Sequence, residues 1–134
     1  MSENIAARVP PGPPPSRILI VEENRDAAHT IGMLCEQMGH QCSFAYDGVA
    51  AIEMARRLRP HVVLLDIGLP RMDGFEVARQ LRAEPSLRGV LIIAVTGSGR
   101  EEDRTRALEI GIDHYLVKPA DPRFLESLLR QRLR

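Results

Sequence analysis

The feature that most constrains how this chain can fold is a regular alternation of short apolar runs with longer amphipathic stretches. Several of the runs, such as those over 17–22 and 61–66, are rich in apolar and β-branched residues, which is typical of strands that are buried on both faces of a sheet. Such an alternation predicts parallel strands, because each right-handed crossover returns the chain to the same end of the sheet. The predicted strands cover residues 17–22, 41–46, 61–66, 90–95 and 113–117. The sequence therefore predicts an α/β fold with five parallel strands and five helices.

The amphipathic stretches carry residues that begin and end helices. Residues that can accept a hydrogen bond from the first helical turn precede three of them, namely Asn24, Asp73 and Asp121, and Asp47–Gly48 forms a turn into a fourth. Gly39 and Gly111 are placed to end two helices, since glycine tolerates the left-handed backbone of a helix end. The predicted helix over residues 100–110 has apolar residues only near its C-terminal end, so we expect its first turns to be weakly anchored.

Length and composition fit one domain of this kind and exclude several functions. The chain has 134 residues, of which 44% are hydrophobic, and this is enough for a single core. Its net charge is +0, which argues against nucleic-acid binding through bulk basic charge. The apolar runs are too short to span a membrane, and the N-terminal sequence does not resemble a signal peptide. We therefore expect a cytoplasmic domain without direct contact to a membrane or to nucleic acid.

Residues 1–16 differ in composition from the rest of the chain. The proline-rich run over 9–16 cannot donate a regular backbone ladder and favours extended polyproline II structure. We expect a disordered proline-rich tail or linker here, either a plain spacer or a docking motif, and a folded domain over residues 17–134. The sequence after that domain leaves no length for an output domain, which predicts a stand-alone domain or a piece of a longer protein.

Side chains that can carry chemistry lie where four of the predicted strands end. They are Glu22 and Glu23 at the first strand, Asp66 at the third, Thr96 at the fourth and Lys118 at the fifth. In open α/β sheets functional groups gather at the carboxyl ends of the strands, so we expect these side chains to meet at one edge. Each alone also fits an ordinary role in a turn or on a solvated surface. Lys118 stands out because it is the one lysine among 18 basic residues.

Together these side chains suit phosphoryl transfer assisted by a metal ion. Clustered carboxylates repel one another unless a cation neutralises them, and ligation by oxygen alone favours Mg²⁺. We predict that Asp66 is the nucleophile and that Glu22 and Glu23 hold the metal. Thr96 and Lys118 are the predicted partners of the remaining phosphoryl oxygens.

The segments around these residues resemble the receiver domain of response regulators in two-component signalling. The resemblance spans residues 17–133 and is carried by ILIVEEN, DGVAAI, VVLLDIGLPRMDG, IIAVTG and HYLVKP. Its most specific segment covers residues 66–74. The resemblance implies a flavodoxin-like, doubly wound sheet with strand order 2-1-3-4-5 and five helices.

The resemblance also implies a metal site around the phosphorylated residue. Asp66 matches the phosphorylated aspartate, Glu22 and Glu23 match the acidic pair that holds Mg²⁺, and the backbone carbonyl of Ile67 matches a further ligand. Glu23 departs from the family, in which the second acidic residue is usually aspartate. Because the extra methylene moves the carboxylate and Mg²⁺ demands near-ideal geometry, we expect altered affinity or binding through water.

The same resemblance assigns the residues that respond to phosphorylation. Thr96 matches the switch hydroxyl, Lys118 the lysine of the family, and Tyr115 an aromatic residue that turns inward, although Tyr115 also fits a plain half-buried strand residue. The Lys118–Pro119 bond is expected to be cis. Ser98, two residues after Thr96, matches a position that tunes the lifetime of the phosphate.

These implications predict a signalling switch rather than an enzyme, in a bacterial phosphorelay. A histidine kinase or a histidine phosphotransfer domain would supply the phosphoryl group. The fourth helix, fifth strand and fifth helix would present the altered surface to a downstream effector, or to a covalently linked kinase domain upstream. Weak homodimerisation is compatible with this function. The alternative is a pseudo-receiver that binds partners without phosphate, which Glu23 keeps open.

Other functions of similar folds fit the sequence less well. A nucleotide hydrolase needs a G-x-x-x-x-G-K-[ST] loop, which the sequence lacks. A phosphatase of the haloacid-dehalogenase type needs a second aspartate two residues after the nucleophile, where this chain has Gly68. A flavin phosphate after the first strand would be repelled by Glu22 and Glu23.

Overall fold

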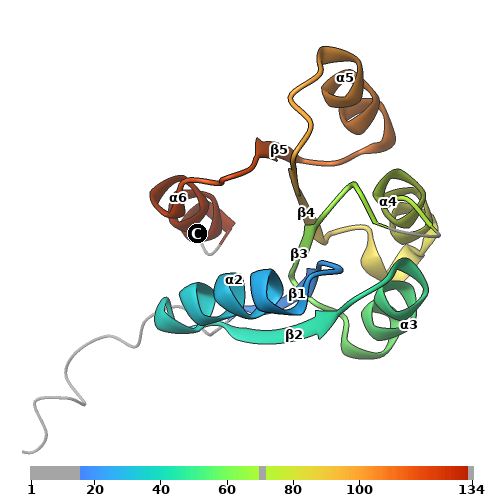
Figure 1. The fold of residues 1–134 in the computed structure, drawn as a ribbon. Helices are drawn as coiled ribbons and strands as arrows, with labels where there is room; N and C mark the ends of the chain where they lie inside the picture. Colours follow the sequence, from blue (N-terminus) through green and yellow to red (C-terminus); the bar gives the residue numbers. More distant parts are fainter. Residues whose placement is uncertain (1–15, 70–71, 133–134) are drawn as a thin grey trace, which may run out of the picture.

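The computed structural model describes residues 16–69 and 72–132, and these residues form a five-stranded parallel sheet (Figure 1). Its strands are β1 (Arg17–Val21), β2 (Gln41–Ala45), β3 (Val62–Leu65), β4 (Leu91–Thr96) and β5 (His114–Val117). Their order in the sheet is β2-β1-β3-β4-β5, which confirms the predicted topology. Residues 1–15 of the predicted tail lie outside the described residues, as do residues 70–71 of the most specific segment.

Helices cover both faces of the sheet. The α-helices of the described residues are α2 (Arg25–Gln37), α3 (Gly48–Leu58), α4 (Gly74–Ala83), α5 (Glu101–Ile110) and α6 (Pro122–Arg132). Figure 1 shows α2 and α6 on one face and α3, α4 and α5 on the other, as the doubly wound fold predicts. A short 3₁₀-helix, η1 (Pro85–Leu87), was not predicted. None of the described helices is long and apolar enough to cross a lipid bilayer.

The sheet divides the buried side chains of the described residues into two clusters. Alternate residues of a strand point to opposite faces, so Leu19 and Val21 of β1 join one cluster while Ile18 and Ile20 join the other. The first cluster also holds side chains from α3, α4 and α5, and the second holds side chains from α2 and α6. Burial on both faces explains why β1, β3 and β4 are apolar with little alternation.

Local caps fix where the helices begin. The side chains of Asn24, Asp47 and Asp73 each accept a hydrogen bond from the backbone N–H three residues on, at 3.0, 2.8 and 2.9 Å. Gly111 ends α5 in the left-handed region, with a φ of 107°, as predicted. These caps hold α2, α3 and α4 directly behind the loops that follow β1, β2 and β3, and they order the edge of the sheet at which those loops meet.

Candidate functional site

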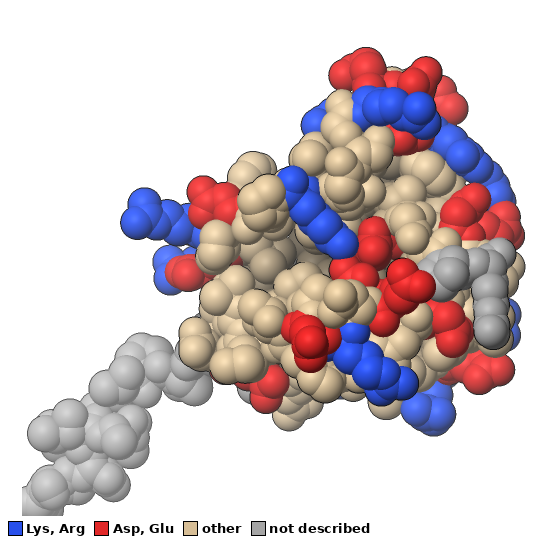
Figure 2. Space-filling model, in the orientation of Figure 1, with Lys and Arg blue, Asp and Glu red and all other residues tan. Residues whose placement is uncertain are grey.

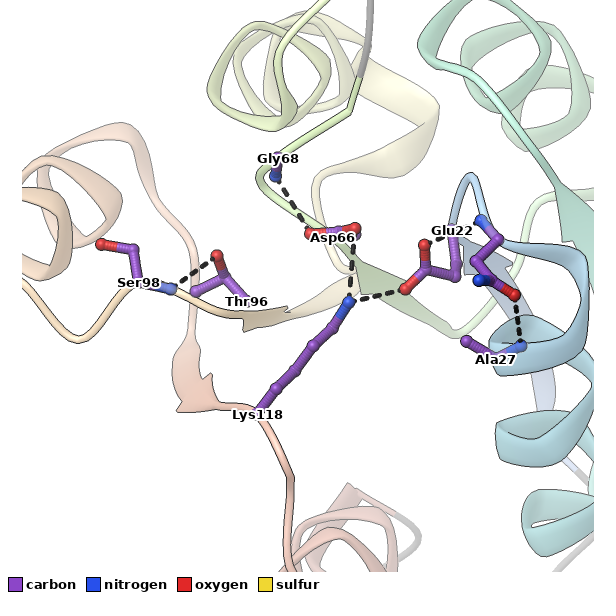
Figure 3. A network of polar contacts seen from close by, with 8 residues as sticks. Glu22, Ala27, Asp66, Gly68, Thr96, Ser98 and Lys118 are labelled. Carbon is purple, nitrogen blue, oxygen red and sulfur yellow. Dashed lines mark hydrogen bonds and ion pairs between the residues drawn. The ribbon is translucent and has the colours of Figure 1, made fainter.

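The carboxyl ends of β1, β3 and β5 bring three charged side chains together (Figure 3). Glu22 and Asp66 follow neighbouring strands, since Val21 of β1 pairs with Leu65 of β3. Lys118 follows β5 and reaches between them, with Nζ 2.6 Å from Glu22 Oε1 and 3.4 Å from Asp66 Oδ2. The structure therefore places these three predicted residues at one edge of the sheet.

Glu22 is held from two sides. Its side chain is 7% exposed, Oε1 accepts a hydrogen bond from Lys118 Nζ, and Oε2 accepts one from Asn24 N at 3.0 Å. Burial alone would raise the pKa of Glu22, but the hydrogen bonds from Lys118 and Asn24 outweigh burial and leave the pKa lowered. Glu22 therefore contributes a fixed negative charge beside Asp66.

The surroundings of Asp66 disfavour the charged form of its carboxyl group. Burial raises its pKa, the hydrogen bond from Gly68 N to Oδ1 at 3.0 Å lowers it, and the charge of Glu22 raises it, so that the pKa is raised overall. For Lys118, burial alone would lower the pKa, but the hydrogen bond to Glu22 and the charge of Asp66 raise it. The ammonium is thus bound most closely by Glu22, and it offsets only part of the repulsion at Asp66.

Of the two glutamates predicted as a metal-binding pair, Glu22 is buried and Glu23 is exposed. Figure 3 shows Lys118 joined to Glu22 and to Asp66 by dashed lines. In the described part of the chain, no three His, Cys, Asp or Glu side chains are arranged to hold a metal ion. The Ile67 carbonyl accepts a hydrogen bond from Gly74 N at 3.0 Å, and a carbonyl oxygen has a second lone pair for a further partner.

Gly74 belongs to the site, although the sequence analysis did not identify it. A Cβ at this position would lie 2.6 Å from Ile67 Cα and 2.7 Å from the Asp66 carbonyl oxygen, so the loop after β3 packs against a residue that must be glycine. The signal in the sequence is the dipeptide Asp73–Gly74, in which Asp73 caps α4 and Gly74 makes the close contact with the loop.

Thr96 and Tyr115 lie on the neighbouring strands β4 and β5. Thr96 is buried, and its Oγ1 accepts a hydrogen bond from Ser98 N at 3.3 Å. The Tyr115 side chain is buried rather than half-buried, and its hydroxyl donates to the Ser98 carbonyl oxygen at 2.7 Å. The Lys118–Pro119 peptide bond is cis, as predicted.

The surface of the molecule carries a local concentration of acidic side chains. Figure 2 shows them gathered near the middle of the view, with a basic side chain reaching toward them. Because the net charge of the whole chain is +0, this acidic character is local. A surface of this kind attracts cations.

Known proteins share this sequence and fold. Residues 18–130 match the family model of the response regulator receiver domain. The chain is 37% identical over 118 residues to the DNA-binding response regulator MtrA of Mycobacterium tuberculosis, which covers 88% of this chain and 50% of MtrA. It is 34% identical over 115 residues to the polar-differentiation response regulator DivK of Brucella anthropi, which covers 85% of this chain and 94% of DivK. The chain thus spans about half the length of MtrA and nearly all of DivK.

A solved structure shares the fold of this chain. The receiver domain of the sensor histidine kinase PA1611 from Pseudomonas aeruginosa is 32% identical and has a TM-score of 0.81, over 89% of this chain and 98% of that one. That structure has a magnesium ion coordinated in its active-site cleft. The family match over most of the chain, together with the strand order and the residues at the strand ends, shows that this chain belongs to the response regulator receiver domain family.

Proposed function

We propose that this chain is a phosphorylation-dependent switch that accepts a phosphoryl group on Asp66. The observation that carries the proposal is the position of Lys118 Nζ between Glu22 and Asp66, at 2.6 and 3.4 Å. From there the ammonium can bind the oxygens of a phosphoryl group attached to Asp66. The phosphoryl group comes from a histidine kinase or a histidine phosphotransfer domain.

The reaction moves the phosphoryl group from a histidine nitrogen of the donor to Asp66. A carboxylate oxygen of Asp66 forms a bond to phosphorus while the phosphorus–nitrogen bond breaks, and the electron pair stays on the imidazole nitrogen. Oδ1 accepts the hydrogen bond from Gly68 N and Oδ2 faces Lys118, so we assign Oδ2 as the attacking atom. The Thr96 hydroxyl then turns from Ser98 N toward the new phosphoryl oxygens.

Magnesium suits the oxygen donors at this edge of the sheet. Carboxylate and carbonyl oxygens are the ligands that Mg²⁺ prefers. The raised pKa of Asp66, caused first by burial and also by the charge of Glu22, indicates that negative charge there is only partly offset. Glu22, Asp66 and the Ile67 carbonyl would hold the ion, with Glu23 joining through water. When bound, Mg²⁺ offsets the charge of the carboxylates and of the incoming phosphoryl group.

The size of the site supports an acceptor of a small group rather than an enzyme that turns over an organic substrate. The hollow that Glu22, Asp66 and Lys118 line together with six apolar side chains has a volume of about 10 Å³. Sites for drug-sized ligands measure roughly 300–1,000 Å³. A phosphoryl group delivered by a partner protein at the surface needs no such pocket.

The output of the switch is a changed surface over α5, β5 and α6. Thr96 ends β4 and Tyr115 lies on β5, so movement of both alters the packing beside α5. Exposed apolar side chains on these elements, Leu108, Val117 and Phe124, offer contact area for a partner. The partner is a downstream effector or a covalently linked kinase domain, and a weak homodimer would use the same face. We place this switch in the cytoplasm.

Incubation with Mg²⁺ and acetyl phosphate tests the proposal. We expect the intact mass of the wild type to increase by one phosphoryl group, Asp66→Ala to stay unchanged, and Lys118→Ala to react more slowly. A beryllofluoride mimic should perturb the amide spectrum of the wild type and not that of Asp66→Ala. A wild type that shows neither a mass increase nor a spectral change, or an equal response in Asp66→Ala, would overturn the proposal in favour of a phosphate-independent interaction module.

A further inference from the structure

The loop between β4 and α5 is organised around Ser98. Its backbone N–H donates to Thr96 Oγ1 at 3.3 Å, and its carbonyl oxygen accepts from the Tyr115 hydroxyl at 2.7 Å. Figure 3 shows Ser98 next to Thr96 at the site. Its side-chain Oγ donates to Asp103 Oδ2 in the first turn of α5, at 2.6 Å. Ser98 thus contacts both residues that we assign to the switch and also the helix that follows.

Asp103 is placed differently from its acidic neighbour in the same turn. Its side chain is 18% exposed, whereas that of Glu102 is 74% exposed. Arg100 occupies the N-cap position of α5, and within the described residues its side chain makes no capping hydrogen bond. Instead, Arg100 N donates to Ser98 Oγ at 3.4 Å and Arg100 Nε contacts Asp103 Oδ2 at 3.4 Å. The Ser98–Asp103 contact therefore joins the loop to the first turn of the helix.

The remaining anchors of α5 lie farther along the helix. Arg104 Nη1 is 3.5 Å from the Tyr115 carbonyl oxygen, and its guanidinium lies 5.0 Å from the centre of the Tyr115 ring. Arg106 lies over the ring of Phe75 at 4.3 Å, and Ala107 is buried. The start of α5 therefore depends on Asp103 for its position relative to the loop.

We propose that Asp103 is a positioning residue for Tyr115. By holding Ser98 Oγ, Asp103 fixes the loop so that the Ser98 carbonyl faces the Tyr115 hydroxyl and the Ser98 N–H faces Thr96. The inference rests on the proposed function, in which Thr96 moves toward phosphorylated Asp66. That movement withdraws the acceptor from Ser98 N, and the Ser98–Asp103 contact carries the resulting shift of the loop into the first turn of α5.

The test follows Tyr115 in the unphosphorylated protein. The chain has two tyrosines and no tryptophan, so labelling with fluorotyrosine gives two fluorine resonances, and Tyr46→Phe identifies that of Tyr115. We expect Asp103→Ala and Ser98→Ala each to raise the ratio of exposed to buried Tyr115 about fivefold, the effect of losing one ordinary hydrogen bond. Asp103→Asn keeps an acceptor for Ser98 Oγ and restores most of the wild-type ratio.

Glu102→Ala is the matched control. Glu102 carries a negative charge in the same helical turn as Asp103, but it is not among the contacts of Ser98 described above. We expect this substitution to leave the Tyr115 ratio unchanged. Hydrogen exchange gives a second readout: Asp103→Ala should accelerate the amides at the start of α5 about fivefold and leave those of β1 and β3 unchanged. An unaltered Tyr115 ratio in both alanine variants, or an equal effect of Glu102→Ala, would contradict the inference.

Phosphorylation by acetyl phosphate, measured on the same samples, separates this inference from the proposed function. If Tyr115 responds to Asp103→Ala while the wild type takes up no phosphoryl group, the proposed function fails and the positioning role stands. If the wild type is phosphorylated and the ratio of exposed to buried Tyr115 is unchanged in both alanine variants, the positioning role alone fails.

Discussion

Helices α4 and α5 cover the same face of the sheet, yet they are held by different means. Helix α4 begins at the Asp73 cap and buries Gly74, Phe75, Val77, Ala78 and Leu81. Of the described residues of α5, Ala107 alone is buried, and the helix begins at Arg100 without a side-chain cap. The loop after Asp66 is therefore backed by a tightly packed helix, whereas the loop after Thr96 leads into one held mainly by polar contacts. A helix held in this second way can shift at low cost in free energy.

Truncating the same side chain in both helices is expected to give the largest contrast. Leu81 of α4 is 0% exposed and Leu108 of α5 is 61% exposed. Leu81→Ala should lower the free energy of unfolding by about 3 kcal/mol because it leaves a cavity, while Leu108→Ala should change it by less than about 0.5 kcal/mol. Urea denaturation of the two variants measures the difference, and equal losses would break the comparison.

Glycines in the two loops should differ in the same direction with a smaller effect. Gly74→Ala forces a methyl group against the backbone of Ile67 and should cost about 2 kcal/mol of unfolding free energy. Gly97→Ala meets no described atom within 4 Å and should be neutral or stabilising, by less than about 1 kcal/mol. Thermal denaturation of both variants suffices, and a tolerated Gly74→Ala would show that the loop after β3 adapts.

Removing the residues at the N-cap positions sharpens the comparison further. Asp73→Ala should cost about 1 kcal/mol, the usual value of a lost capping hydrogen bond. Arg100→Ala should change stability by less than about 0.5 kcal/mol, because the Arg100 side chain is 70% exposed and makes only surface ion pairs. Hydrogen exchange of the first turns locates both effects. An equal loss of protection in α4 and α5 would argue that both starts are equally fixed.

The smallest expected effect concerns charge in the loop that α4 supports. Burial, followed by the charge of Glu22, raises the pKa of Asp66. A carboxyl with a raised folded-state pKa costs no stability below its unfolded pKa, and this cost is complete above its folded pKa. Asp66→Asn should therefore increase the free energy of unfolding at neutral pH, and the gain should vanish below about pH 3.9, the ordinary pKa of aspartate. Urea denaturation across this pH range tests the prediction. An Asp66→Asn variant that is less stable than the wild type at neutral pH would contradict it.

Much of the fold and part of the site follow from local signals. The runs that became β1, β3 and β4 were recognisable because burial on both faces demands unbroken apolar sequence. Asp66, Thr96 and Lys118 were identified because parallel strands end at the same edge, which brings together residues that are distant in the chain.

The features that the sequence analysis missed depend on where side chains point. Glu22 and Glu23 are neighbours in sequence, yet Glu22 is buried and contacts Lys118 while Glu23 is exposed, a difference that the residue pattern does not show. The contact of Ser98 with Asp103 likewise depends on a loop path that no residue pattern encodes.

Arg82 is a further example of a contact that only the tertiary structure reveals. Its guanidinium donates to the carbonyl oxygens of Gly111 and Val90 at 2.9 and 2.8 Å and to Asp113 Oδ2 at 2.7 Å. It joins the end of α4 to the start of β4 and to the turn between α5 and β5. In the sequence, Arg82 is one of 18 basic residues, and its neighbours along the chain give no sign of this role.

The division of the buried side chains by the sheet has a consequence for how the protein can change over time. The cluster beneath α2 and α6 and the cluster beneath α3, α4 and α5 lie on opposite faces, with the strands between them. Substitutions that share no partners and lie more than roughly 7–10 Å apart usually have additive effects. Selection or design can therefore alter the exposed faces of α2 and α6 to change which proteins bind there, without changing the contacts that position α5.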